Sequence, residues 1–507
     1  MEGICMTGFF GYLLSALQAI FTIKGLIYII GGSLLGMFLG CIPGLSGGTL
    51  ITLLLPIFWK MDPVLGLGLL IAIHVGSVSG GSIGSILLGI PGTSSAIATV
   101  WDGYEFTKQG DPVRALSAAT VSGTFGRIPG LLFAAGLSTW IAIYAVKLGP
   151  WEYTSMCFAA IAMVITLSKK DIFKGLMAIG LAILMSSIGQ DIVYGTGRLT
   201  FGSLNLYQGF NVINILLGLF AAKIILLEFA RREKENMAEK IQVKRFRWPG
   251  KDLKNNVGLM IRSFITGAFI GFLPGIGGQT STVMAYSNER GLAKDKEKWG
   301  HGAIGGVIAP EIANSAGIGG ALIPMLALGI PGDGIVAQFM VALNSMDIAT
   351  GPLFIKNNPH IVYMIFTGGI IACIFMFVIQ IIGMPLFPMM LRIPYQYLYP
   401  VILIVCFIGS YVVKGSLWGV LVMLISLVLA LLMDYFDIPA LPFLMTFILS
   451  STFERNLRLG FNYSHNGGLD FLIRPVSLLF ILVGVFMLCW GLFGNKLWEK
   501  RKARRSE

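Results

Sequence analysis

Long apolar runs separated by short polar segments dominate this chain. Runs such as 131–146, 213–227, 361–382 and 417–433 approach the roughly 20 residues that a helix needs to span the hydrocarbon core of a bilayer. Their spacing predicts an all-α polytopic membrane protein with about 12 transmembrane helices. Residues 8–23 are shorter and more polar, which favours an interfacial or short helix.

Two of the apolar runs contain the same break. The segment Gly40–Thr49 places Pro43-Gly44 before small residues and a threonine, and the segment Gly271–Thr280 repeats this order with Pro274-Gly275. Proline and glycine end a helix, because proline lacks the N–H group and glycine adopts backbone geometries closed to other residues. Paired breaks in two halves of a membrane protein are the best sequence indication of a transporter's binding site.

A second pair of breaks, Gly89–Gly92 and Gly329–Gly332, reads Gly-Ile-Pro-Gly in both places. The first pair is separated by 231 residues and the second by 240, so we infer two related halves with re-entrant hairpins or broken helices at the substrate site. The predicted organisation is an N-terminal segment (1–24), a first repeat (25–227), a basic linker (228–256), a second repeat (257–494) and a basic tail (495–507).

Lysine-rich segments indicate which loops face the cytoplasm. The linker, the loop Lys294–Lys298 and the segment Lys169–Lys174 are rich in lysine, whereas their counterparts in the other half carry few positive charges. Corresponding loops on opposite faces indicate an inverted repeat. The tail from Lys496 to Arg505 disagrees, because strict inversion would place its six basic residues outside; an extra crossing would remove the conflict.

Composition narrows the class of protein. The chain is 55% hydrophobic and 12% charged, with a mean hydropathy of +0.79, which is more apolar surface than a soluble core could hide. The net charge of +12 lies in short segments between spans, as the positive-inside bias requires, so no nucleic-acid partner is expected. The polar link Trp101–Pro112 is interpreted as a loop at the membrane surface.

Known catalytic motifs are missing from the sequence. It contains no Walker loop, dinucleotide fingerprint, zinc-protease motif or nucleophile elbow, and its six cysteines are scattered. We therefore expect neither an enzyme nor a cofactor beyond a coupling ion. The single histidine of the apolar stretch 63–101, His74, is interpreted as a hydrogen-bonded core residue rather than a proton relay.

The helices after the breaks have the chemistry of an anion site. Each begins with free backbone N–H groups and the positive end of its dipole, so it can bind a carboxylate without a buried lysine or arginine. The alternative is that the breaks only shape the helix bundle. The candidate substrate-binding residues are Pro43, Gly44, Ser46, Gly47, Thr49, Pro91, Gly92, Thr93, Ser94, Pro274, Gly275, Gly277, Gly278, Thr280 and Ser281.

Two isolated acids mark the second half. Glu311 and Asp333 are the only ionisable side chains between Gly302 and Ser345, and such acids are costly in a membrane unless they bind a cation, take up protons or face a polar cavity. We therefore expect a coupling-ion site, with Na⁺ or H⁺ as the ion; the alternative is that either acid lies at the interface or caps a helix. The candidate residues are Glu311, Asn314, Ser315, Pro331, Gly332 and Asp333.

Five segments carry motifs that follow one another along nearly the whole chain, namely Gly40–Gly47, Pro91–Gly103, Gly189–Gly202, Pro310–Asn314 and Leu328–Gly332. These motifs, in this order, resemble those of the large membrane subunit (TctA type) of the tripartite tricarboxylate transporters. Four positions depart from the family's usual residues, namely Ser46, Ile192, Leu199 and Ser315.

This resemblance implies a permease of the bacterial cytoplasmic (inner) membrane that works with a small four-helix membrane subunit (TctB type) and a periplasmic solute-binding protein (TctC type). Such a symporter imports citrate-like or other organic carboxylates, driven by a Na⁺ or H⁺ gradient. Together with the breaks, it predicts a secondary transporter whose core moves relative to a scaffold, as in an elevator. The alternative is an anion channel, or a structural membrane subunit without transport of its own.

Overall fold

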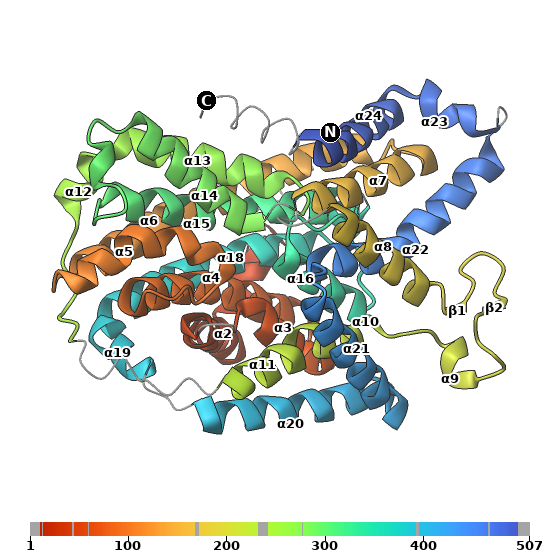
Figure 1. Ribbon diagram of the computed structural model, residues 1–507, viewed down its shortest axis with the longest axis horizontal. Helices are drawn as coiled ribbons and strands as arrows, with labels where there is room; N and C mark the ends of the chain where they lie inside the picture. Colours follow the sequence, from red (N-terminus) through yellow and green to blue (C-terminus); the bar gives the residue numbers. More distant parts are fainter. Residues whose placement is uncertain are drawn as a thin grey trace. The chain divides into compact units, whose positions relative to one another are not determined.

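The computed structural model describes residues 11–12, 14–42, 45–58, 60–167, 172–231, 242–275, 277–351, 353–391, 395–464 and 467–494. These residues are mostly helical (Figure 1). Pro43 and Gly44 of the first break and the tail 495–507 lie outside the described residues, and so do residues 169–171 of the lysine-rich segment Lys169–Lys174.

The first half contains ten helices among the described residues, one short hairpin of two antiparallel strands, β1 (Gly189–Gln190) and β2 (Gly197–Arg198), and a π-helical turn at Leu217–Ala222. A 3₁₀ turn, η1 (Ser94–Ala96), precedes α5. The helices are α2 (Ile23–Cys41), α3 (Gly47–Phe58), α4 (Pro63–Leu88), α5 (Ile97–Lys108), α6 (Pro112–Ala145), α7 (Pro150–Leu167), α8 (Ile172–Ser186), α9 (Leu204–Tyr207), α10 (Val212–Leu216) and α11 (Lys223–Arg231).

The regular elements among the described residues of the second half are all helical, with short 3₁₀ turns at Lys296–Lys298, Met384–Leu386 and Gly467–Leu469 and a π-helical end at Trp490–Gly494. The helices are α12 (Gly250–Lys254), α13 (Val257–Phe272), α14 (Gly277–Leu292), α15 (Gly305–Leu328), α16 (Gly334–Ser345), α17 (Phe354–Asn357), α18 (Pro359–Gly383), α19 (Phe387–Met390), α20 (Tyr395–Lys414), α21 (Leu417–Tyr435), α22 (Ala440–Tyr463), α23 (Asp470–Ile473) and α24 (Pro475–Cys489).

Seven helical segments among the described residues are long and apolar enough to cross a membrane, and six shorter apolar helices of 10–17 residues accompany them. The expectation of an all-α polytopic membrane protein is confirmed. The expected total of about 12 spans and the inversion of the repeats stay predictions. The long segments are Ile23–Cys41, Pro63–Leu88, Pro112–Ala145, Gly305–Leu328, Pro359–Met390, Leu417–Tyr435 and Pro475–Leu492.

All four predicted helix breaks are confirmed. α2 ends at Cys41 and α3 begins at Gly47, while α13 ends at Phe272 and α14 begins at Gly277. The second breaks follow α4 and α15, and each of these helices ends on a left-handed glycine, Gly89 with φ of 71° and Gly329 with φ of 73°. A side chain at either position would strain the backbone, which explains the repeated Gly-Ile-Pro-Gly sequence.

The chain folds into two compact units. The first comprises Met1–Ala142, Ile224–Leu273 and Gly277–Gly409, and the second comprises Ile143–Lys223, Pro274–Ile276 and Ser410–Glu507. Each unit draws on both halves of the sequence. The predicted division into two repeats is a different partition of the chain, and it stays a prediction.

α4 and α15 form the core of the first unit. In the apolar 18-residue window of α15, 94% of the residues are buried, and in that of α4, 83% are buried. The corresponding share for the segment Pro475–Leu492 of the second unit is 11%. α2 packs along α4 and α13 packs along α15 (Figure 1). Helices of the two halves also pack against each other. α3 of the first half lies against α16 of the second, and α14 of the second half lies against η1 and α5 of the first.

Glycines allow the close approach of these central helices. A methyl group added at Gly36 of α2 would lie 2.9 Å from the Cα of Ile73, and one added at Gly271 of α13 would lie 2.9 Å from the Cα of Gly317. Small residues at helix interfaces take this role in membranes, where there is no hydrophobic driving force between helices.

The segment Trp101–Pro112 was expected to be a loop at the membrane surface, and this prediction is wrong. Residues up to Lys108 form α5, and Asp102 is fully buried. A buried carboxylate needs hydrogen-bond donors, and four of them surround Asp102. Its Oδ2 accepts from Tyr286 Oη (2.9 Å), and its Oδ1 accepts from the N–H groups of Gly300 (2.9 Å), Gly302 (2.9 Å) and Ala303 (2.7 Å).

Replacement of Gly36 by leucine is expected to destabilise the protein, because the new side chain would meet the backbone of Ile73 in α4. Overpacking of this kind costs about 1–3 kcal/mol. Gly31→Leu is the matched control, since a methyl group there meets nothing within 4 Å. Thermal melting of the purified variants in detergent measures the difference. Equal melting temperatures for Gly36→Leu and Gly31→Leu would refute the packing argument.

Candidate functional site

The start of α14 brings together residues from three other segments of the first unit. A methyl group at Gly278 would lie 2.9 Å from Asn314 Oδ1 and 3.1 Å from the Cβ of Ser95, and one at Gly277 would lie 3.4 Å from the Cβ of Asp333. Gly277 has φ of 65°, a geometry that favours glycine. These side chains come from α15, from η1 and from the residue before α16. We call this group of five residues the α14 tip.

The α14 tip is accessible. Residues 277–280 are only half-buried, and so are Ser95 and Asp333. The first N–H groups of a helix have no acceptor within the helix, and the dipole makes this end positive. The α14 tip is therefore partly exposed, and its helix start can attract an anion.

The corresponding start of α3 is closed. Gly47, Gly48 and Thr49 are buried, the N–H of Gly47 donates to Ser77 Oγ at 2.6 Å, and Gly48 lies against the Gln338 side chain. One of the free donors expected there is thus occupied. The sequence predicted two equivalent anion sites, but the two helix starts differ in accessibility.

Three buried polar atoms around the helix starts have no hydrogen-bond partner among the described residues: Asn314 Nδ2, Gln338 Oε1 and His74 Nδ1. His74 also lies near enough to Asp333 for an electrostatic interaction. Buried polar atoms without partners are costly and rare in proteins. They indicate a polar interior in which a ligand, an ion or water can supply the missing hydrogen bonds. The sequence analysis expected His74 to be hydrogen-bonded, and its Nδ1 atom is not.

Asp333 caps α16. Its Oδ1 accepts a hydrogen bond of 2.8 Å from the N–H of Val336, which is the cap that the sequence analysis held open as the alternative role. Since Asp333 also borders Gly277, the α14 tip itself contains a carboxylate charge. Such a charge would attract a cation and repel a second carboxylate.

Glu311 lies in a separate buried polar cluster with Arg127. Glu311 is 1% exposed, and its carboxylate accepts from Ser82 Oγ (2.5 Å) and Thr99 Oγ1 (2.6 Å). Arg127 of α6 is also 1% exposed, and its Nη1 donates to Ser79 Oγ at 2.6 Å. The positive charge of Arg127 acts on Glu311. The expected acids therefore differ, because Glu311 is already hydrogen-bonded and has a countercharge.

The remaining candidates lie in different surroundings. Ser46 and Ser281 form hydrogen bonds within their own helix starts, to Thr49 N (3.4 Å) and to Gly278 O (2.8 Å). Ser315 accepts from Arg127 Nε at 3.3 Å, and Thr93 shares a hydrogen bond of 3.2 Å with Ser95. Backbone packing surrounds Gly92 and Gly332, next to Pro91 and Pro331, while Ser94 is exposed and Pro274 and Gly275 belong to the second unit.

Sequence reasoning missed Arg127, and a signal was present. Arg127 is the only charged residue between Arg114 and Lys147, which is the isolation that drew attention to Glu311 and Asp333. The partner serines and threonines could not have been singled out, because they are common on apolar helices. Among the described residues no group of three or more His, Cys, Asp or Glu side chains could hold a metal ion.

Comparison with known proteins assigns the family. The family described as "Tripartite tricarboxylate transporter TctA family" matches residues 26–445. The chain belongs to this family. TctA membership makes it a multi-pass membrane subunit of a tripartite tricarboxylate transporter and confirms the resemblance inferred from the motifs.

Two relatives come from Agrobacterium vitis. The "Uncharacterized 52.8 kDa protein in TAR-I ttuC' 3'region" is 31% identical over 463 residues, which cover 91% of this chain and 91% of the relative. The "Uncharacterized protein in TAR-II ttuC' 3'region" is 30% identical over 223 residues, 44% of this chain and 91% of that relative. No solved structure matches the TctA chain.

The Glu311 and Arg127 cluster predicts a coupled stability effect. Removal of one charge leaves the other without its nearby countercharge in the interior. The cost should stay below the roughly 3–5 kcal/mol of a directly paired buried salt bridge, because no ion pair joins the two groups. Glu311→Gln and Arg127→Gln should each lower the melting temperature of the purified protein. The double variant should lose less stability than the sum of the two single losses. Strictly additive losses would show that the two residues act independently.

Proposed function

We propose that this TctA chain is the permease of a binding-protein-dependent secondary transporter that imports organic carboxylates. It would lie in the bacterial inner membrane and work with a TctB-type small membrane subunit and a TctC-type periplasmic binding protein. A Na⁺ or H⁺ gradient would drive the import. The observation that carries this proposal is the accessible α14 tip, where a helix start meets unpartnered buried polar atoms.

The substrate carboxylate would bind first at the α14 tip. The N–H groups at Gly278 and beyond point out of the helix start, and the Nδ2 atom of Asn314 is a buried donor without a partner among the described residues. Donors of this kind bind an oxyanion without a charged residue. The start of α3 can receive a second carboxylate only after a movement that exposes Gly47 and Gly48.

The coupling ion would bind near Asp333 and Asn314, whose carboxylate and amide oxygens belong to the α14 tip. Oxygen ligands of this type suit a hard cation, and an acid in this position can alternatively take up a proton. A cation there would offset the charge of Asp333 and so favour a neighbouring substrate carboxylate. Ion and substrate binding would thereby be coupled through one electrostatic interaction.

Two features support alternating access in an elevator-like movement. The chain folds into two compact units, and the first contains α2 to α5 and α13 to α16, the helices on both sides of all four breaks. The crossed packing of α3 on α16 and of α14 on η1 and α5 is consistent with two repeats related by a two-fold axis. A core unit of this kind can carry the site relative to a scaffold.

Asp333→Asn is expected to abolish gradient-driven uptake by the complete transporter in proteoliposomes, because it removes the charge that binds the ion. Asparagine is itself a good N-cap, so α16 should keep its start. Asp347→Asn is the matched control, since Asp347 is exposed and follows the same helix. Unchanged Na⁺ or H⁺ dependence in Asp333→Asn would disprove the ion site.

The same reconstituted system separates a transporter from a channel. Labelled substrate should accumulate by counterflow against unlabelled substrate inside the vesicles, which a passive pore cannot produce. Glu311→Gln tests the other acid. If gradient-driven uptake survives in both Glu311→Gln and Asp333→Asn, the coupling ion does not use either residue.

Gly278→Ala is expected to weaken substrate binding. The added methyl group would lie 2.9 Å from Asn314 Oδ1, so the amide must turn away from the α14 tip. A loss of about 1.4 kcal/mol would raise KM tenfold. Gly31→Ala, in open space on α2, serves as control. Initial uptake rates over a range of substrate concentrations give KM for each variant. An unaltered KM for Gly278→Ala would place the substrate elsewhere.

A further inference from the structure

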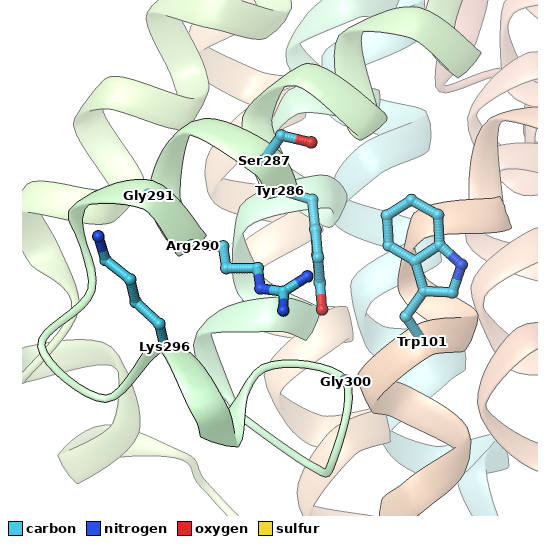
Figure 2. Close-up of a pocket in the computed structure, with 7 residues that line it drawn as sticks. All are labelled: Trp101, Tyr286, Ser287, Arg290, Gly291, Lys296 and Gly300. Atoms are coloured by element: carbon cyan, nitrogen blue, oxygen red, sulfur yellow. The ribbon is translucent and has the colours of Figure 1, made fainter. Parts of the chain in front are cut away.

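A cavity of about 600 Å³ lies at the other end of α14 (Figure 2). None of the residues assigned above to substrate or ion lines it. Figure 2 shows Arg290 extending beside the Tyr286 ring, with Trp101 beyond the ring and Lys296 on the following loop. The lining residues used here are Trp101, Tyr286, Arg290, Lys296 and Gly300. We call this space the α14 cavity.

The two cationic side chains of the α14 cavity form no ion pair with any described residue. Their neighbours do: Arg262 pairs with Glu289 at 2.5 Å, and Lys298 pairs with Asp295 at 2.7 Å. The hydrogen bond from Lys298 lowers the pKa of Asp295. Arg290 and Lys296 therefore keep their charge available for a ligand.

A rigid aromatic wall borders these charges. The Tyr286 ring contacts Trp101 with centroids 4.7 Å apart and Trp299 with centroids 5.1 Å apart, both edge to face. Tyr286 Oη donates to Asp102, which also accepts from the loop that contains Gly300. The charge of Asp102 is thus spread over several donors, and the wall needs no rearrangement to receive a ligand, which lowers the cost of binding.

We propose that the α14 cavity binds an oxyanion, a carboxylate or phosphate group held by Arg290 and Lys296, with Trp101 covering the apolar part of the ligand. Guanidinium groups match the geometry of both oxyanions. The loop Lys294–Lys298 is predicted to be cytoplasmic, so the oxyanion can belong to a soluble organic anion or to the headgroup of an anionic lipid.

Occupation of the α14 cavity would act on the other end of the same helix. Arg290 lies 13 residues after Gly277, about 20 Å along α14 at 1.5 Å per residue. A bound anion would link α14 to the loop before α15 through Lys296. This cytoplasmic site goes beyond the proposed function, and it does not depend on which substrate the α14 tip receives.

The test is a titration of the purified full chain in detergent at constant ionic strength, with citrate or inorganic phosphate as probe, chloride as reference and the melting temperature as readout. The wild type should show a saturable increase. The double variant Arg290→Gln, Lys296→Gln should weaken the apparent affinity at least tenfold, about 1.4 kcal/mol. Lys298→Gln should bind like the wild type, because it removes the same charge from the same loop without lining the cavity.

The second arm uses nanodiscs of phosphatidylcholine with or without phosphatidylglycerol. Stabilisation by phosphatidylglycerol that the double variant loses identifies a lipid headgroup, whereas a response to citrate or phosphate alone identifies a soluble anion. Should the double variant fold poorly, the single change at exposed Lys296 gives the same comparison. The proposal is wrong if the wild type responds to none of the probes, or if Lys298→Gln loses as much as the double variant.

Discussion

A helix can be broken inside a membrane protein only where its freed backbone groups are buried in protein or face a polar cavity. The helices that flank all four breaks of this TctA chain lie in the first unit together with α4 and α15, which are its most buried apolar spans. The close approach of α2 and α13 to these helices, made possible by glycines such as Gly36 and Gly271, brings the breaks against polar side chains. Packing thereby determines where chemistry can occur.

The same constraint explains the buried charges. Arg127 and Glu311 each have hydroxyl partners from neighbouring helices, and each lowers the cost of burying the other. They join α4, α5, α6 and α15 into one polar cluster. Because the polar groups of this cluster already have hydrogen-bond partners, the cluster holds these helices together. The unpartnered polar atoms around the α14 tip are instead suited to binding a ligand.

Sequence patterns were sufficient for the all-α membrane class, the four breaks and the isolated acids, because these follow from local chemistry. Proline and glycine end helices wherever they lie, and an acid in an apolar run is visible without a structure. Burial was not predictable in the same way. Asp102 lies in a polar segment, yet the donors that surround it lie more than 180 positions further along the chain. Ser77 closes the start of α3 for the same non-local reason.

The two halves share the same helix breaks but differ in the side chains around them. This difference is relevant to the coupling of ion and substrate binding. At the separation of 240 residues set by the second breaks, Asn314 corresponds to His74, Asp333 to Thr93 and Glu311 to Ile71. The left-handed glycines Gly89 and Gly329 are retained in both halves, so the broken-helix geometry does not require the acids. Acids that the geometry does not need, in a setting where they are costly, are best explained by a charge that the second half must bind or balance. For Glu311 a countercharge is supplied by the nearby Arg127; for Asp333, a half-buried member of the α14 tip, we propose a mobile cation.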